Sequence, residues 1–229
     1  MQYMQNKETI PSRSGMELER YIPRTTRKIM LCGDHTPMLA KKLRLRYACP
    51  EISGILSDVE NRADSEHFHE VFHEPVENIE VPEAAYDCIV VDGLMHRLRN
   101  PKVTLSHLIR FLHPGGLMII TAPNVQYHQR LMMLARGYWT YDTAESNVSL
   151  LPRSQIRYFT AYDLSLLVKD AGLSEVKCNA LLSDLPEAFP LDAEGYHQSG
   201  NIRIGPLTAG EYQNWLIREL VVFGIRIAG

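Results

Sequence analysis

YDCIVVDGLMHRLRNPKVTLSHLIRFLHPGGLMIITAPNV, residues 86–125, decides the fold of this chain. The stretch contains an apolar strand over 86–93, an amphipathic helix over 104–113 and a second apolar strand over 117–123. The helix carries an apolar stripe at Leu105, Leu108, Ile109 and Leu112, and the Pro-Gly-Gly at 114–116 ends it. A strand whose residues are apolar in succession is buried on both faces, so the pattern predicts a parallel sheet between two helical layers.

The same rhythm continues on both sides of this stretch. It predicts further strands over 28–33, 52–58, 69–74, 173–179 and 219–228, and helices over 37–48 and 161–172. The predicted fold class is therefore α/β, a Rossmann-like sheet of seven mainly parallel strands with helices on both faces. Residues 182–212 carry Gly and Pro at loop-like intervals, which indicates an irregular insertion before the last helix and strand.

Composition limits the function further. The chain has 229 residues, 45% of them hydrophobic, which suits one substantial domain, and a formal net charge of −3, which does not favour nucleic-acid binding. Its four cysteines, Cys32, Cys49, Cys88 and Cys178, are widely spaced, as expected of buried thiols in a reducing compartment. The apolar runs are shorter than the roughly 20 residues of a membrane span. These features predict a cytoplasmic protein without a membrane span or a nucleic-acid partner.

Two segments resemble a known family. They are residues 86–125 and RGYWTYDTAESNVSLLPRSQIRYFTAYDLSLLVKDAGL, residues 136–173. The order of motifs resembles the class I S-adenosylmethionine-dependent methyltransferases, particularly the bacterial subgroup found with glycan and cell-surface biosynthesis. The resemblance rests on a Gly-x-Trp-x-Tyr element at 137–141 and an Arg-Phe-Phe-Thr-like element at 157–160. It implies a class I methyltransferase domain over 25–229, an N-terminal tail or cap over 1–24, and lid elements at about 125–155 and 182–212.

The first strand and turn depart from that family. In KIMLCGDHTPMLAKK, residues 28–42, the family's acidic residue and three glycines align with Leu31, Gly33, His35 and Pro37. Only Gly33 is kept. An imidazole at position 35 occupies space where the cofactor normally lies, and Pro37 lacks an amide donor. The resemblance implies S-adenosylmethionine as the cofactor, but this turn lacks two of the three glycines that let the backbone pass close beneath it.

Other cofactor positions are altered as well. Leu56 stands where the family usually presents a carboxylate to the ribose, and Leu94-Met95-His96 replaces the familiar Leu-Glu-His. Nearby acids could substitute after a small change of register. The resemblance to S-adenosylmethionine enzymes thus implies these cofactor-binding candidates: Gly33, Asp34, His35, Asp58, Glu74 and Asp92.

A methyl transfer to a hydroxyl gains from a base near neutral pKa, and His96, just after the fourth strand, is the predicted catalytic base. His35 and His128 are weaker candidates for this role. The histidines at 67, 69 and 73 recur at close spacing, but the sequence shows no partner ligands and predicts no metal site. Aromatic rings and an arginine suit a sugar face or a phosphate. The predicted substrate-binding residues are Asn124, Tyr127, Trp139, Tyr141, Arg157 and Tyr158.

Three function classes remain open. One is a methyltransferase with an atypical cofactor loop, acting on a hydroxyl or amine of a sugar, glycan or related small molecule. Another is a catalytically silent methyltransferase-like protein that serves as a partner or scaffold subunit, in a complex or as a homo-oligomer. A third is a protein that binds another nucleotide or nucleotide-sugar in the same crevice. The elements at 137–160 and the acids near the altered cofactor positions favour the first class, which is the predicted function. The altered loop favours the second class, which is its alternative.

Overall fold

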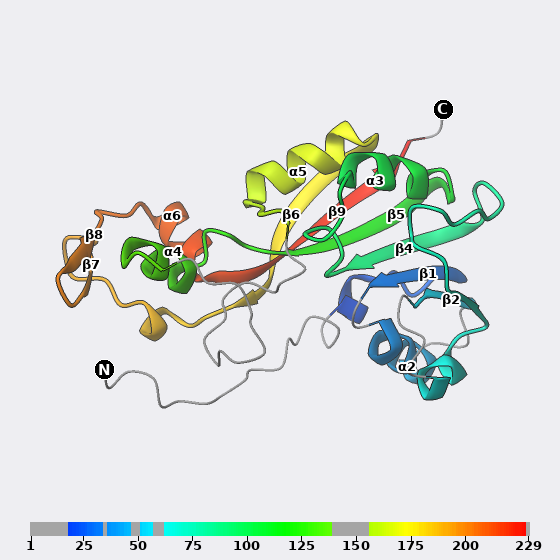
Figure 1. Cartoon of the computed structure of the whole chain (residues 1–229), viewed down its shortest axis with the longest axis horizontal. Helices are drawn as coiled ribbons and strands as arrows, with labels where there is room; N and C mark the ends of the chain where they lie inside the picture. Colours follow the sequence, from blue (N-terminus) through cyan, green and yellow to red (C-terminus); the bar gives the residue numbers. More distant parts are fainter. Residues whose placement is uncertain (1–17, 34–35, 47–50, 57–61, 139–155, 228–229) are drawn as a thin grey trace.

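The computed structural model describes residues 18–33, 36–46, 51–56, 62–138 and 156–227 (Figure 1). Their main feature is a seven-stranded sheet of order β3-β2-β1-β4-β5-β9-β6, in which β9 runs antiparallel between β5 and β6 and the other neighbours pair in parallel. This arrangement confirms the predicted fold class. The strands are β1 (Lys28–Gly33), β2 (Glu51–Ile55), β3 (Glu70–Phe72), β4 (Tyr86–Asp92), β5 (Leu112–Pro123), β6 (Leu173–Ser183) and β9 (Ile217–Arg226).

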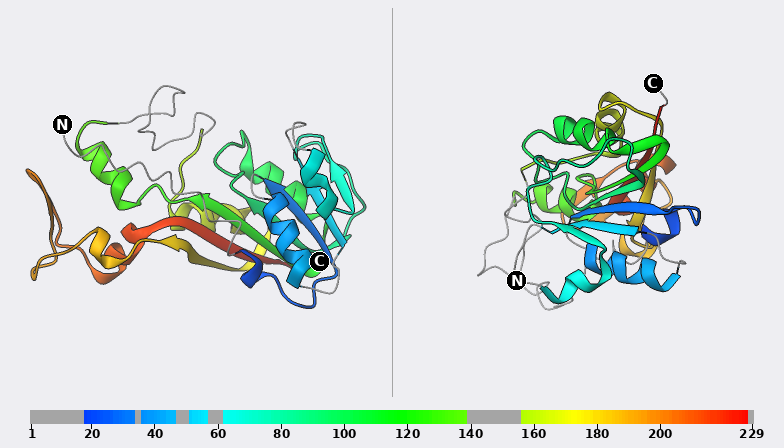
Figure 2. Two further views of the ribbon diagram at one scale, coloured as in Figure 1. Left: turned by 90° about the horizontal axis from the view of Figure 1, so that it is seen from below. Right: turned by 90° about the vertical axis from the view of Figure 1, so that its right-hand side faces the viewer.

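Helices cover both faces of the sheet (Figure 2). The 3-10 helix η1 (Leu18–Tyr21) and α2 (Thr36–Arg46) pack on one face, and α3 (Pro101–Ile109) and α5 (Ala161–Asp170) pack on the other. Side chains alternate between the two faces of a strand. In β4, Cys88 and Val90 join the core beneath α2, whereas Ile89 and Val91 join the core beneath α3 and α5. The burial on both faces that was predicted from this apolar run is therefore confirmed.

The helix predicted over 104–113 is wrong at both ends. Helix α3 begins at Pro101, which suits a first helical position, and ends at Ile109. Beyond it, the amide of Tyr86 donates to the carbonyl of Phe111 at 2.9 Å, and Tyr86 pairs with Leu112. Pairing with β4 thus takes this backbone into the sheet before the Pro-Gly-Gly turn is reached.

Beyond one end of the long strands β5, β6 and β9 lies a small lobe, which we call the end lobe (Figure 1). It consists of α4 (His128–Ala135), the 3-10 helix η3 (Pro186–Ala188), β7 (His197–Ser199), β8 (Ile202–Ile204) and α6 (Ala209–Leu216). Met132, Phe189 and Leu216 form its own buried cluster. The segment predicted as an irregular insertion therefore contains a two-stranded sheet. Its role as a lid stays a prediction, as do the proposed tail and domain limits.

Two further expectations concern thiols and membranes. Cys32 and Cys88 are free and fully buried, and burial raises the pKa of both thiols well above the ordinary range; Cys178 is also free, and Cys49 lies outside the described residues. In the part of the chain that the structure describes, no helix has the length and apolar character needed to cross a membrane.

Candidate functional site

The turn after β1 is built around Gly33. Strand pairing sets this residue beside Asp92 of β4, and a Cβ atom at Gly33 would lie 1.8 Å from the carbonyl oxygen of Asp92. The backbone has φ +120°, and the buried Thr36 donates its hydroxyl to the carbonyl of Gly33 at 3.0 Å. The close approach of β1 to β4 is therefore sufficient to require glycine here. The neighbouring cofactor candidates Asp34 and His35 lie outside the described residues.

Leucines occupy the two positions at which the resemblance expects cofactor carboxylates. Leu31 is fully buried in the core beneath α2, and the half-buried Leu56 packs against the same core. The amide of Leu56 donates to the carbonyl of Phe72 at 3.0 Å, so this residue continues the contact between β2 and β3. Glu74 is exposed beyond β3, and Asp58 lies outside the described residues.

Asp92, the last residue of β4, is a fully buried carboxylate. Its Oδ1 accepts a hydrogen bond of 2.7 Å from the hydroxyl of Thr121 on β5, and that hydroxyl accepts one of 2.8 Å from the amide of Gly93. Asp92 thus ties the ends of β4 and β5 together, which is a structural use of a predicted cofactor residue.

The turn between β4 and α3 is fastened to residues 156–157. His96 is 6% exposed, and its carbonyl accepts hydrogen bonds from the amides of Ile156 and Arg157 at 2.9 and 3.1 Å. The guanidinium of Arg157 donates from Nε to the carbonyl of Leu98 at 3.0 Å and from Nη2 to that of Arg99. Arg157, predicted to bind substrate, therefore secures the turn that carries the predicted base.

Asn124 lies at the junction of β5, α6 and β9 and is fully buried. Its Nδ2 donates to the carbonyls of Asn214 and Ile217, both at 2.9 Å, and its Oδ1 accepts from the amide of Gln126 at 3.0 Å. Arg130 donates to its carbonyl at 2.5 Å. Both amide hydrogens of this predicted substrate residue are therefore used on backbone groups at the end of α6.

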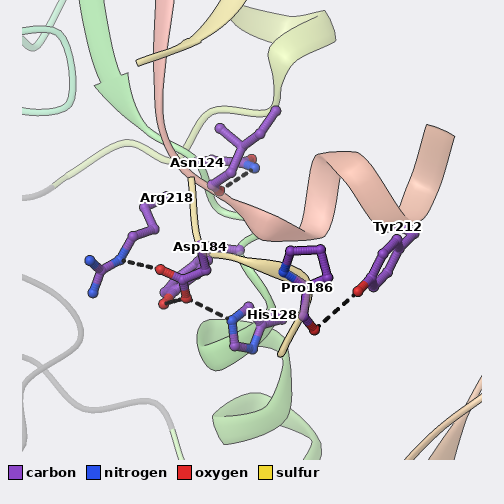
Figure 3. Close-up of polar contacts among 8 residues, drawn as sticks. Asn124, His128, Asp184, Pro186, Tyr212 and Arg218 are labelled. Carbon is purple, nitrogen blue, oxygen red and sulfur yellow. Dashed lines mark hydrogen bonds and ion pairs between the residues drawn. The ribbon is translucent and has the colours of Figure 1, made fainter. Parts of the chain in front are cut away.

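A polar network joins the end lobe to the long strands (Figure 3). At its centre, Oδ2 of Asp184 accepts from the Tyr127 hydroxyl at 2.5 Å and lies 3.0 Å from Nε2 of His128. Nε of Arg218 lies 3.3 Å from Oδ1 of the same carboxylate. With Asp184 ionised, the imidazole Nε2–H is the donor. One carboxylate thus binds a phenol, an imidazole and a guanidinium.

Burial sets the proton affinities in this network. It raises the pKa of the Tyr127 phenol, and the hydrogen bond to Asp184 acts in the same direction. Burial lowers the pKa of His128, although Asp184 opposes that shift. The rings of His128 and Phe189 lie 4.9 Å apart, and His197 stacks on Phe189 at 3.8 Å. His128, which the sequence offered as a weaker candidate for the catalytic base, is therefore packed against an aromatic cluster.

Sequence reasoning missed Asp184 and Arg218. Asp184 directly follows β6, and Arg218 is the second residue of β9. A charged residue close to a strand terminus was the signal that could have found them. Of the other predicted substrate residues, Tyr158 is half-buried, and Trp139 and Tyr141 lie outside the described residues. His67 ends the 3-10 helix η2 (Arg62–His67), so the three closely spaced histidines do not lie on one strand. Among the described residues, no three His, Cys, Asp or Glu side chains form a metal-binding group.

The described residues lack two of the carboxylates by which the resemblance expects S-adenosylmethionine to be held. Leu31 and Leu56 are apolar where carboxylates are expected, and Asp92 is buried against Thr121. Close packing of β1 on β4 accounts for Gly33 without a ligand. The polar groups of Asp92, Asn124 and Asp184 join strand ends to one another and to the end lobe.

Comparisons with known protein sequences place this chain among methyltransferase domains. A family model for a methyltransferase domain matches residues 32–177. Over 127 residues, 54% of the chain, it is 29% identical to a highly reducing polyketide synthase of Purpureocillium lilacinum. Over 118 residues, 50% of the chain, it is 28% identical to a malonyl-[acyl-carrier protein] O-methyltransferase of Paenibacillus sp. (strain JDR-2). The matches span 4% of the synthase and 40% of the methyltransferase.

Solved structures show the same fold at low identity. A methyltransferase from Archaeoglobus fulgidus aligns with a TM-score of 0.63 and 12% identity over 93% of this chain and 92% of that one. A chain from the complex of the Haloferax volcanii Trm112 activator with a methyltransferase aligns at 0.60 and 13%, over 93% and 88%. A Burkholderia thailandensis N1-methyltransferase with bound S-adenosylhomocysteine aligns at 0.55 and 12%, over 95% and 78%.

Proposed function

Since the chain belongs to the family of methyltransferase domains, we propose that it is a catalytically silent member that serves as a partner or scaffold subunit. The observation that carries this proposal is the use of polar groups at the cofactor edge. Asp92, the fully buried acid at the end of β4, accepts the Thr121 hydroxyl at 2.7 Å. The fold is retained, and this carboxylate serves the fold itself.

The magnitude of the loss supports weak or absent cofactor binding. A charge-assisted hydrogen bond to a buried ligand group is worth about 1–3 kcal/mol. Leu31 and Leu56 each replace an expected carboxylate. Two such losses amount to roughly 2–6 kcal/mol, which corresponds to a weakening of about 30-fold to 10⁴-fold. A dissociation constant of about 1 μM would become roughly 30 μM to 10 mM.

The predicted acceptor side supports the same proposal. The amide of Asn124, the hydroxyl of Tyr127 and the guanidinium of Arg157 each bind a group of this chain. Binding a sugar hydroxyl or a phosphate would require these contacts to be exchanged. Such residues are better suited to maintaining a shape that another protein recognises.

A partner role has a precedent among the structural neighbours. The Haloferax volcanii neighbour was solved in a complex with a methyltransferase activator, so a chain of this fold is able to form a heteromeric assembly. We carry this over as a proposal that the present chain works in a complex. The class of the partner is an enzyme or activator of methyl transfer.

A second candidate is methyl transfer from S-adenosylmethionine to a hydroxyl or amine of a sugar, glycan or related small molecule. The specific observation in its favour is that the family match, residues 32–177, includes the strand ends β1, β2, β3 and β4 at which the cofactor resemblance is located. The Burkholderia thailandensis neighbour contains S-adenosylhomocysteine. In this candidate, His96 is the predicted base, and Asp34, Asp58 or Glu74 supplies the missing carboxylate.

Calorimetric titration with S-adenosylmethionine and S-adenosylhomocysteine separates the two candidates. For a silent member we expect no heat and no rise in melting temperature at millimolar ligand. Ligand at 100 times its dissociation constant would add about 2.7 kcal/mol of stability. A dissociation constant in the micromolar range, lost in a Glu74→Gln variant that folds normally, would support the second candidate and contradict the first.

The partner role needs its own measurement. Purification from the native source under mild conditions is expected to recover a second protein in fixed stoichiometry, and the reassembled complex should be more active or more stable than that protein alone. A single monomeric species, together with tight cofactor binding, would count against a partner role.

A further inference from the structure

We propose that a cavity at the other end of the central strands binds a small primary ammonium compound. The cavity lies where β1 and β4 begin, far from the strand ends described above, and its volume is about 220 Å³. That volume is below the range of about 300–1,000 Å³ that is usual for drug-sized ligands, so the ligand must be small. The lining residues are Pro23, Thr25, Thr26, Asp87, His113, Pro114, Gly115, Gly116 and Leu117.

Asp87 provides the charge. Its Oδ2 accepts hydrogen bonds from the backbone amides of Arg27 and Lys28 at 2.8 and 2.9 Å, and these two bonds fix the carboxylate. Its Oδ1 has no hydrogen-bond partner within the described residues. Because Asp87 is the one carboxylate among the described side chains that line the cavity, the cavity offers a fixed negative charge.

Asp87 is half-buried, and two glycines form the wall beside it. A Cβ atom at Gly116 would lie 2.8 Å from the carbonyl oxygen of His113 and 3.2 Å from that of Asp87, so the turn packs tightly there. At Gly115, φ is +81° and a Cβ atom would have no neighbour within 4 Å among the described residues, so this side is open. Thr25 is exposed beside it. The result is a short, open recess with a rigid floor.

The chemistry of the lining favours an ammonium group. An ammonium has three N–H donors and no acceptor, and the polar residues that line the cavity are one carboxylate, two threonines and the histidine His113. A charge-assisted hydrogen bond is about twice as strong as a neutral one. A neutral diol cannot form a charge-assisted hydrogen bond with Asp87, and an anion is repelled by this carboxylate. This inference is independent of the proposed function.

Nuclear magnetic resonance titration of the full chain tests the proposal, with ethanolamine as the probe and ethylene glycol as its neutral counterpart. Ethanolamine is expected to shift the amide resonances of Gly115, Gly116 and Lys28 in a saturable way. Ethylene glycol should bind at least about tenfold more weakly, because it lacks the charge. Equal binding of the two probes, or no shift at about 50 mM of either, would overturn the proposal.

Variants locate the effect. Asp87→Asn keeps an acceptor oxygen for the amides of Arg27 and Lys28 but removes the charge, so ethanolamine binding should fall to the level of the diol. Glu83→Gln, an exposed acid that pairs with Arg110, makes the same change in net charge and should leave binding unchanged. If Asp87→Asn does not fold, Thr25→Val gives the answer: a threefold or greater loss supports the site, and unchanged binding contradicts it.

Discussion

Glycine is required at position 33 by the packing of two strands, whereas the family resemblance suggests that it is required for the approach of a cofactor. The carbonyl of Asp92 fills the space of the missing side chain, so glycine is needed for β1 to approach β4. The same reasoning applies to Leu31, which replaces an acid and joins the core beneath α2. Packing alone explains both Gly33 and Leu31. Neither residue is therefore evidence that a cofactor binds at this end of the strands.

Gly33→Ala should therefore be strongly destabilising. The added methyl would lie 1.8 Å from a backbone oxygen that cannot move without distorting β4, and φ is +120°. We expect a loss of about 3 kcal/mol or more in the free energy of unfolding, measured by urea denaturation.

Gly172→Ala is the matched control. Its φ is +114°, but the added methyl would have no neighbour within 4 Å in the described part of the chain, so it carries the backbone strain without the clash. A loss of about 1–2 kcal/mol is expected. Equal losses in the two variants would show that the contact with Asp92 is not the reason for glycine at position 33.

At the scale of elements, the side chain of Asn124 connects β5 to α6 and β9. Asn124 supplies two donors at the end of α6, to the carbonyls of Asn214 and Ile217, and the Asn214 carbonyl also accepts the amide of Ile217. Asp184 makes a comparable connection between β6, α4 and β9. The buried Asn124 and the partly buried Asp184 thus fix the end lobe to the sheet.

Asn124→Asp should loosen this junction. The change replaces two donors by acceptors that face carbonyl oxygens at 2.9 Å in a fully buried place. We expect a loss of about 2–4 kcal/mol in the free energy of unfolding. Gln126→Glu is the control, since Gln126 accepts from Asn214 through Oε1 at 2.7 Å and glutamate retains that acceptor. Similar losses for both would contradict the role given to the Asn124 donors.

His128 should make stability depend on pH. Burial lowers its pKa in the folded state, so the unfolded chain binds more protons near the ordinary histidine pKa of about 6.5. The contribution is present above that pH and is lost as the pH falls through it, by at most about 1.4 kcal/mol per pH unit.

Urea denaturation between pH 5 and pH 8 measures this slope. His128→Gln should flatten it, whereas His73→Gln, at an exposed position, should leave it unchanged. A slope that persists in His128→Gln would assign the pH dependence to another group.

At the scale of the whole molecule, stability should be uneven. Two large cores enclose the central strands, whereas the buried cluster of the end lobe consists of Met132, Phe189 and Leu216. Regions with few buried apolar contacts open locally at lower free energy than the main core. The end lobe and the sheet are expected to behave as separate units of opening.

Hydrogen exchange followed by mass spectrometry checks this expectation. Amides of α6 should exchange at least about tenfold faster than those of β1 and β4. Phe189→Ala should increase exchange in the end lobe and leave β1 and β4 nearly unchanged, because Phe189 is buried only in the lobe cluster. Leu105→Ala, in the core beneath α3, should instead lower protection throughout the sheet. Uniform exchange in all regions would contradict the two units.

The order of apolar strands and amphipathic helices, read from the sequence alone, determined the sheet and its two helical layers. Burial on both faces leaves a periodic trace in the residues themselves, and β4 is the clearest example. Helix α3 was predicted less well, because its end depends on pairing of Phe111 and Leu112 with a strand distant in sequence.

Only the tertiary structure decided what the polar residues at the sheet edge do. Asp92 accepts a hydrogen bond from Thr121, and Asn124 donates to a carbonyl at the end of α6. Asp184 binds His128 of α4 and Arg218 of β9. These contacts join residues far apart along the chain, and a hydrogen bond of this kind leaves no periodic pattern in sequence. Family membership therefore follows from the sequence, whereas the commitment of the site residues to the fold follows from distances in space.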